Sequence, residues 1–286
     1  MNIAVIFSTL RPDTIGIYFE KAMRALGHNV DHFQSHEIPN ITKKYQLYLC
    51  IDDGLNQDEL PRHLFPKVFY AIDVHLRGPE SKMRKKILKG SYDLVFSPAQ
   101  WWIDKMKRVS PVELIWMNHG CDPEIHKRLD LERIYDIGFV GTDGGVPRKF
   151  YLQEIRERYP NSFIGTADYR EMGRIYSSSK IGFSFPIRSE YLTLRNYEIM
   201  ASGAMLLMKR LRDDSAERLG FVDRKNIVIF DGPKDLFEKI DYYLKNNKER
   251  DRIAEAGYKL TVEKHTYLHR AKEMIDIISD RFDIKN

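Results

Sequence analysis

Residues 189–209 read SEYLTLRNYEIMASGAMLLMK, a polar segment that passes through a glycine into an apolar run. The polar segment predicts a helix that ends at Gly203, because glycine commonly terminates helices. Leu192, Ile199 and Met200 can face a core from this helix. The apolar run at 204–208 predicts a short buried strand. A helix that leads directly into a buried strand indicates a layered α/β fold.

Three charged side chains of this segment form a candidate binding site. Arg195 and Glu198 are three residues apart, which places them one turn apart on one helix face. Glu190 precedes Glu198 by eight positions and would lie within about 80° of it on the same helix. A helix N-terminus with an arginine suits a diphosphate, and a carboxylate further along suits ribose hydroxyls. The alternative is an ordinary surface pair between Arg195 and Glu198.

The composition indicates ordinary globular cores. The 286 residues are 43% hydrophobic and 12% aromatic, which suffices for two domains of ordinary size. No apolar run approaches the roughly 18 residues that a membrane span needs. The first residues, MNIAVIFSTL, lack a basic start and predict a first strand instead of a signal peptide.

The net charge and the two cysteines do not indicate a specific binding partner. A net charge of +5 permits an anionic partner without requiring one. The densest basic run consists of Lys82, Arg84, Lys85, Lys86 and Lys89. It favours a solvated helix face over a binding patch. Cys50 and Cys121 form no paired spacing with other cysteines or histidines that would indicate zinc, and a reducing, cytoplasmic location is expected.

Strand and helix patterns alternate through the first half of the chain. Strands are expected at 2–8, 29–33, 45–51, 67–73, 92–97 and 112–116, and helices at about 13–26, 80–89 and 98–108. Asp13 is the expected helix cap. This alternation predicts a parallel sheet that is covered on both faces. The first strand–helix loop lacks G-x-G-x-x-G, which argues against a dinucleotide site in this half.

A second alternation follows residues 119–133, which we interpret as a linker. Strands are expected at 136–141, 162–165, 181–185, 204–208 and 226–230, with helices at 148–159, 169–177 and over most of 233–282. The loop GTDGGVP at 141–147 follows the first of these strands. Its glycines would let backbone N–H groups approach phosphate oxygens, although a plain turn has the same pattern. Two doubly wound halves would face each other across a cleft, where such sheets bind ligands at the carboxyl ends of their strands.

The string TLRNYEIMASGAMLL at 193–207 resembles the donor-site helix of GT-B glycosyltransferases. It is most similar to the CgeB-type (spore-maturation-protein-like) enzymes and to the phage DNA beta-glucosyltransferases, in which an arginine, a glutamate three residues later and a small-residue turn mark the sugar-nucleotide site. The resemblance implies two Rossmann-like domains that face a central cleft. Residues 1–122 would bind the acceptor and 123–264 the nucleotide sugar, while a C-terminal helix at 265–286 would pack back on the first domain.

The resemblance also implies a set of donor-binding residues, which are Gly141, Thr142, Arg148, Gly165, Glu190, Arg195 and Glu198. Arg148 and Arg195 would converge on the diphosphate, so that no metal is required. The adjacent pair Asp52 and Asp53 offers no Asp-x-Asp motif, and neighbours on a strand point apart. Glu190 and Glu198 also mimic the paired glutamates of the large retaining group of this fold, although its glycine-rich loop near the first glutamate is absent here.

The stretch FYAIDVHL at 69–76 resembles the region of the phage DNA beta-glucosyltransferases that supplies the catalytic aspartate. Asp73 would therefore be the general base that deprotonates an acceptor hydroxyl. His75 is the alternative base. Asp73 could instead cap a helix or shape a loop.

The expected function is a glycosyltransferase without a cofactor, which moves a sugar from a UDP-sugar such as UDP-glucose to a hydroxyl acceptor. With Asp73 as the base the reaction inverts the anomeric centre, and with the glutamate pair it retains it. A nucleotide-sugar 2-epimerase and a non-catalytic sugar-nucleotide or nucleic-acid binding module are the alternatives. The acceptor stays open between a modified DNA base, a spore or surface glycan and a protein.

Overall fold

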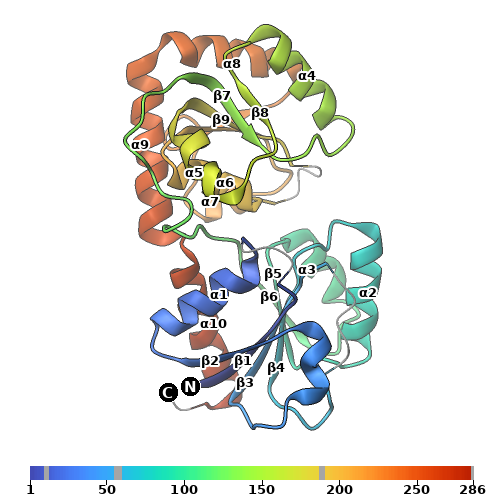
Figure 1. The fold of residues 1–286 in the computed structure, drawn as a ribbon. Coiled ribbons are helices and arrows are strands. Elements are labelled where there is room, and N and C mark those ends of the chain that lie inside the picture. Colours follow the sequence, from blue (N-terminus) through green and yellow to red (C-terminus); the bar gives the residue numbers. More distant parts are fainter. Residues whose placement is uncertain (10–12, 55–59, 187–190, 285–286) are drawn as a thin grey trace. The chain divides into compact units, whose positions relative to one another are not determined.

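The computed structural model describes residues 1–9, 13–54, 60–186 and 191–284. The chain forms two compact units, each built on one parallel sheet (Figure 1). Unit 1 comprises Met1–Asn118 and Tyr267–Asn286, and unit 2 comprises His119–Thr266. The segment expected to be a linker, 119–133, thus belongs to unit 2. No helix of the described residues is long and apolar enough to cross a membrane.

Unit 1 contains a six-stranded parallel sheet with the order β2-β1-β3-β4-β5-β6. Its elements are β1 (Asn2–Ile6), α1 (Ile15–Ala25), β2 (Asn29–Phe33), the 3-10 helix η1 (Ser35–Asn40), β3 (Leu47–Ile51), β4 (Lys67–Tyr70), α2 (Arg77–Leu88), β5 (Leu94–Ser97), α3 (Gln100–Met106), β6 (Glu113–Trp116) and α10 (Tyr267–Phe282). Every residue of β3, β4 and β5 is buried, as expected for parallel strands covered on both faces.

Helix α10 completes unit 1 from the far end of the sequence. It lies beside α1, where the ring of Tyr267 is 5.0 Å from that of Tyr18 and 5.2 Å from that of Phe19 (Figure 1). Helix α1 begins after Thr14, whose hydroxyl accepts a hydrogen bond from the N–H of Ile17 at 3.5 Å. The expected cap, Asp13, is therefore wrong by one residue, because Thr14 occupies the position from which a side chain reaches the first free N–H groups.

Unit 2 contains a five-stranded parallel sheet with the order β11-β10-β9-β7-β8. Its elements are β7 (Tyr135–Val140), α4 (Arg148–Arg158), β8 (Phe163–Gly165), α5 (Tyr169–Ser177), β9 (Ser179–Ser184), α6 (Leu194–Ala201), β10 (Met205–Lys209), α7 (Ser215–Arg218), β11 (Val228–Phe230), α8 (Pro233–Lys245) and α9 (Asn247–Lys264). Separate apolar cores cover the two faces of the sheet, and successive residues of β10 alternate between them. The predicted doubly wound α/β class is confirmed.

Helix α6 differs from the expected helix in where it starts. It begins at Leu194, because Thr193 and Asn196 form a capping box in which the Asn196 side chain accepts from the N–H of Thr193 at 3.0 Å. Glu190 lies outside the described residues, and α6 starts after it. The helical face that Glu190 and Glu198 are expected to share therefore stays a prediction. The predicted end at Gly203, with a φ of +83°, is confirmed.

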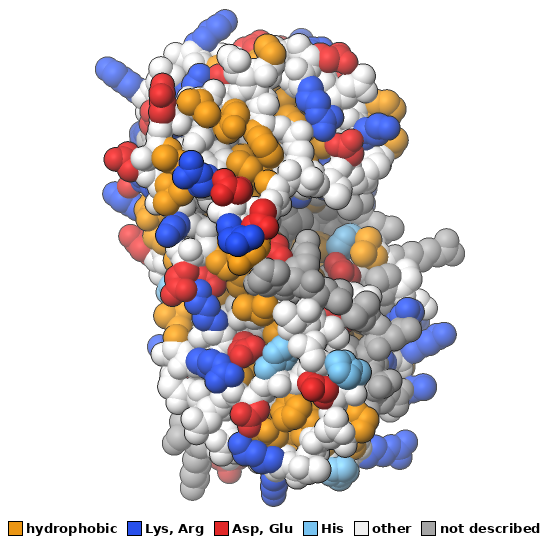
Figure 2. Space-filling view, in the orientation of Figure 1, with side chains coloured by type: hydrophobic (Ala, Val, Ile, Leu, Met, Phe, Trp, Pro, Cys, Tyr) orange, Lys and Arg blue, Asp and Glu red, His pale blue; other side chains and the backbone are white. Residues whose placement is uncertain are grey.

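Helix α6 is also more buried than its polar residues suggest. Each residue from Asn196 to Ala201 is buried, since the helix packs between the sheet and α9. On the surface, Lys and Arg side chains lie among Asp and Glu over the face shown in Figure 2. The net charge of +5 therefore does not gather into one patch on that face.

Candidate functional site

The topology of unit 2 indicates where a ligand would bind. Strand β8, which follows β7 in the sequence, pairs with one edge of β7, and the next strand, β9, pairs with its other edge. Parallel sheets bind ligands at such a reversal, outside the carboxyl ends of the two strands. The loop that starts at Gly141 follows β7, and α6 with Arg195 in its first turn follows β9. The structure thus brings the glycine-rich loop and Arg195 to this reversal.

Arg195 lies against the end of β7. Its Nε donates a hydrogen bond to the carbonyl of Val140 at 3.0 Å, and its guanidinium carbon is 4.5 Å from the centre of the Phe139 ring. Gly141 has a φ of +147°, and a Cβ at this position would collide with Nη2 of Arg195. Glycine is therefore favoured here, since other residues rarely adopt this φ and a Cβ would displace the guanidinium of Arg195 from this position.

Gly165 belongs to the same end of the sheet. It is the last residue of β8, and its carbonyl accepts a hydrogen bond from the N–H of Gly141 at 2.7 Å. Thr142 follows Gly141 and is exposed. The sequence prediction grouped Gly141, Thr142 and Gly165, and the structure brings all three to one edge.

Arg148 donates hydrogen bonds to the backbone of the Gly141 loop. Its side chain donates to the carbonyls of Thr142 (2.9 Å), Asp143 (3.0 Å) and Phe185 (3.3 Å), and the residue is only 5% exposed. A guanidinium has five N–H groups, so two have no partner among the described residues. The pKa of Arg148 is lowered to about 10, mainly by burial and also by the nearby charge of Arg195, while the charge of Asp143 opposes this. An anion at the loop would relieve the repulsion between the two guanidinium groups.

Glu198 lies one turn beyond Arg195 on α6 and is buried. Its Oε1 is 3.7 Å from Nε2 of His126, whose side chain is fully buried. The Nδ1 atom of His126 accepts a hydrogen bond from the backbone N–H of Asp122 at 3.1 Å. The neutral ring must therefore carry its hydrogen on Nε2, the nitrogen that faces Glu198.

Tyr176 connects these groups to the sheet. Its hydroxyl accepts from the N–H of Val140 at 3.1 Å, and burial raises its pKa, with the charge of Arg195 opposing this and that of Glu198 adding to it. The sequence prediction missed His126 as part of this group. No spacing could have revealed it, because it lies in an irregular polar segment far from α6 in the sequence.

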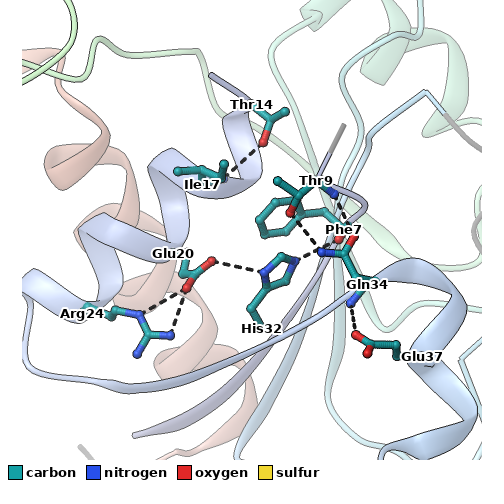
Figure 3. A network of polar contacts seen from close by, with 9 residues as sticks. All are labelled: Phe7, Thr9, Thr14, Ile17, Glu20, Arg24, His32, Gln34 and Glu37. Atoms are coloured by element: carbon teal, nitrogen blue, oxygen red, sulfur yellow. Dashed lines mark hydrogen bonds and ion pairs between the residues drawn. The ribbon is translucent and has the colours of Figure 1, made fainter. Parts of the chain in front are cut away.

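Unit 1 has a corresponding reversal at the carboxyl ends of β1 and β3, since β2 and β3 flank β1. A polar network links the segment that follows β1 to the end of β2 and the segment after it (Figure 3). The Gln34 side chain accepts from the N–H of Thr9 at 2.9 Å and donates to its hydroxyl at 3.1 Å. The N–H of Gln34 donates to Glu37 at 2.7 Å, and the ring of His32 stacks on Phe7 at 4.1 Å. This edge is therefore lined by polar side chains that bond to one another.

Asp73 lies at this edge, three residues beyond the end of β4 at Tyr70. Burial raises the pKa of its carboxyl to about 6, and the neighbouring charge of Asp52 contributes to the rise. Asp53 faces the other way and accepts from the N–H of Ser8 at 2.7 Å and the hydroxyl of Ser35 at 2.9 Å. The expectation that Asp52 and Asp53 point apart is confirmed. His75, the alternative base, is half-buried in the turn after Asp73.

Several solved structures match nearly the whole chain. Sucrose-phosphate synthase from Thermosynechococcus elongatus has a TM-score of 0.70 at 12% identity, with 99% of each chain covered. A DNA-modifying beta-glucosyltransferase has a TM-score of 0.65 at 14% identity, covering 99% of this chain and 100% of its own. HepE from Anabaena has a TM-score of 0.66 at 10% identity, covering 98% of this chain and 100% of its own. These similarities show the GT-B fold of two Rossmann-like domains.

Sequence comparison gives the family. The chain has no match among the curated protein sequences. The profile of a family described as glycosyl transferase-like matches residues 126–276, from His126 through the whole of α6 to the middle of α10. This match covers more than half of the 286 residues, and the chain therefore belongs to the glycosyl transferase-like family.

Proposed function

We propose that this protein transfers a hexose from a UDP-sugar, such as UDP-glucose, to a hydroxyl group of an acceptor. The observation that carries the proposal is the pairing of Arg195 with the Gly141 loop at the strand reversal of unit 2. Two structural neighbours add support, because one was solved in the presence of uridine diphosphoglucose and another in complex with UDP and glucose. Among glycosyltransferases of this fold, we place the chain with the CgeB-like enzymes.

The donor would be held by unit 2. The backbone of the Gly141 loop and the guanidinium of Arg195 would bind the diphosphate, and the buried Arg148 would add positive charge beneath it. Glu198 would accept hydrogen bonds from the ribose hydroxyls, and the backbone at Gly165 would contact the nucleobase. The T4 phage BGT was solved with UDP and Mn2+. Here we propose that the two arginines neutralise the diphosphate without a metal.

The transfer would be a single displacement. The Asp73 carboxylate would take the proton of the acceptor hydroxyl while that oxygen forms a bond to the anomeric carbon. The bond between this carbon and the phosphate oxygen of UDP would break at the same time, and UDP would leave with its negative charge held by the arginines. A carboxyl with a pKa of about 6 is ionised at neutral pH and is a stronger base than an ordinary aspartate. The product would have an inverted anomeric centre.

The acceptor would be a hydroxyl-bearing molecule. The structural neighbours include a DNA-modifying beta-glucosyltransferase and an alpha-glucosyltransferase solved with DNA. A modified DNA base is therefore one acceptor class to test, and a surface or spore glycan is another.

The proposal is tested with radiolabelled UDP-glucose, followed by UDP release and by label transfer to DNA containing hydroxymethylated bases or to glycans. The wild-type protein should release UDP slowly with water alone and faster with the correct acceptor. Asp73→Asn should keep UDP affinity and lower transfer by about 10²–10⁴-fold, the usual contribution of a positioned base. Product stereochemistry by NMR should show inversion. Near-normal transfer by Asp73→Asn, or a retained centre, would overturn Asp73 as the base, and no UDP release with any acceptor would overturn the transferase itself.

A further inference from the structure

Asp52 lies immediately beyond β3 and joins it to the segment that carries Asp73. The strand ladder between β3 and β4 ends with Ile51 opposite Tyr70, and the N–H of Asp52 extends it with a bond to the carbonyl of Tyr70 at 3.0 Å. Beyond this bond, the side chain of Asp52 accepts the next hydrogen bonds from the backbone that follows β4. One of its oxygens, Oδ2, accepts from the N–H of Ile72 at 3.0 Å and of Asp73 at 2.8 Å.

The other oxygen of the same carboxylate is also occupied. Oδ1 of Asp52 accepts from the N–H of Gly54 at 3.1 Å. Gly54 has a φ of +76°, and a Cβ on it would lie 3.6 Å from Oδ2 of Asp73. Three backbone N–H groups thus converge on one half-buried carboxylate, and the turn around it brings Gly54 next to the carboxyl of Asp73.

We propose that Asp52 is a positioning residue for Asp73, which fixes the backbone that carries the Asp73 carboxylate and holds a negative charge beside it. This inference rests on the proposed function, in which Asp73 is the general base. It assigns Asp52 a role in the reaction that requires no contact with either substrate.

The charges around the pair support this role. Burial raises the pKa of Asp52, and its three N–H bonds oppose that rise because they stabilise the ionised form. The negative charge of Asp53 also raises the pKa of Asp52. For Asp73, burial is the larger cause of a pKa of about 6 and the charge of Asp52 is the second. The half-buried His75 follows Asp73 by two residues.

The two parts of the role can be separated by substitution. In Asp52→Asn the amide oxygen can still accept from the N–H groups of Ile72 and Asp73, whereas the negative charge is gone. In Asp52→Ala both the charge and the acceptor are lost. Asp53→Asn is the matched control, because it removes the same charge from the adjacent residue, whose hydrogen bonds go to Ser8 and Ser35 instead.

The experiment measures hydrolysis of UDP-glucose to UDP, with water as the acceptor, as a function of pH. In the wild type kcat/KM should rise with pH to a plateau, with a midpoint near pH 6 set by Asp73. In Asp52→Asn the midpoint should move to lower pH and the plateau should fall, since Asp73 becomes a weaker base. The midpoint of Asp53→Asn should move less. In Asp52→Ala kcat should fall while KM for UDP-glucose stays unchanged.

The outcomes separate the two proposals. If Asp73→Asn abolishes hydrolysis but Asp52→Asn leaves the midpoint at its wild-type pH, the role of Asp52 is overturned and the proposed function stands. An equal shift in Asp52→Asn and Asp53→Asn would likewise overturn a specific role for Asp52. If Asp73→Asn hydrolyses UDP-glucose normally, the base assignment fails, and the inference about Asp52 fails with it.

Discussion

Oε1 of Glu198 lies 3.7 Å from Nε2 of His126, inside the buried part of unit 2. The histidine is oriented by the N–H of Asp122, so its Nε2 hydrogen faces the carboxylate. This contact places the Glu198 carboxylate beside a buried ring, on the helix that carries Arg195. In the proposed function this carboxylate accepts hydrogen bonds from the ribose hydroxyls.

Glu198→Gln should weaken binding of UDP, on the order of tenfold, because a neutral amide replaces a charged acceptor for ribose hydroxyls. Binding of pyrophosphate, which has no ribose, should change much less. Isothermal titration calorimetry with both ligands checks this. Equal losses for the two ligands would show that Glu198 acts on the diphosphate or on the fold, and not on the ribose.

Gly141→Ala should reduce UDP affinity at least tenfold, because the new Cβ displaces the guanidinium of Arg195. Gly145→Ala is the control in the same loop. Gly145 also has a positive φ, +78°, but no atom lies within 4 Å of its would-be Cβ. Both variants should lose about 1–2 kcal/mol of stability from backbone strain, whereas only Gly141→Ala should lose UDP. Calorimetry and thermal melting measure the two effects, and an equal loss of affinity would contradict the assignment of Arg195.

Arg148 and Arg195 should respond differently to replacement by alanine. Arg148→Ala removes the donor of three backbone carbonyls. Of these, the carbonyl of Phe185 is bonded in a buried setting, where a group left unsatisfied costs about 1–3 kcal/mol, so Tm should fall by several degrees. Arg195→Ala should lower Tm less and weaken UDP binding by about 1.5–3 kcal/mol, the usual value of a charge-assisted hydrogen bond. The reverse order of effects in melting and calorimetry would exchange the two roles.

UDP binding should be the same with and without EDTA. The two guanidinium groups supply the positive charge that a metal would otherwise provide. Titrations of one protein preparation, divided between EDTA and added Mn2+, measure this directly. A large loss of affinity in EDTA would show that the arginines alone do not neutralise the diphosphate.

Asp73→Asn should raise thermal stability at neutral pH even though it removes the proposed base. The carboxyl has a pKa of about 6 in the folded protein and about 3.8 when unfolded, so the folded state binds the proton more tightly. Ionised Asp73 therefore disfavours folding above pH 6, and this penalty disappears below pH 3.8. The Tm difference between variant and wild type should be positive at pH 7.5 and vanish as the pH falls below about 4. Asp53→Asn should show no such gain, because it weakens hydrogen bonds to Ser8 and Ser35.

Local sequence patterns were sufficient to predict most of the fold. The inner strands β3, β4 and β5 are buried on both faces, and helices separate most of the strands, which is the pattern of parallel doubly wound sheets. The end of α6 at Gly203 and the one-turn spacing of Arg195 and Glu198 follow from glycine conformation and helical periodicity. These features depend on neighbours within a few residues. The start of α6 was predicted too early in the sequence, because the capping box of Thr193 and Asn196 starts the helix after the polar residues that precede it.

The sequence by itself thus determined the α/β class, the two halves and the presence of a charged helix beside a glycine-rich loop. Only the tertiary structure decided which groups meet. Arg195 donates a hydrogen bond to the carbonyl of Val140, which is 55 residues away in the sequence. Asp52 accepts a hydrogen bond from the N–H of Asp73, 21 residues away. Glu198 lies beside His126, which belongs to an irregular segment. These contacts depend on the order of the strands and on which carboxyl ends lie side by side. Local periodicity carries no record of that order, because the same strand pattern is compatible with many sheet topologies.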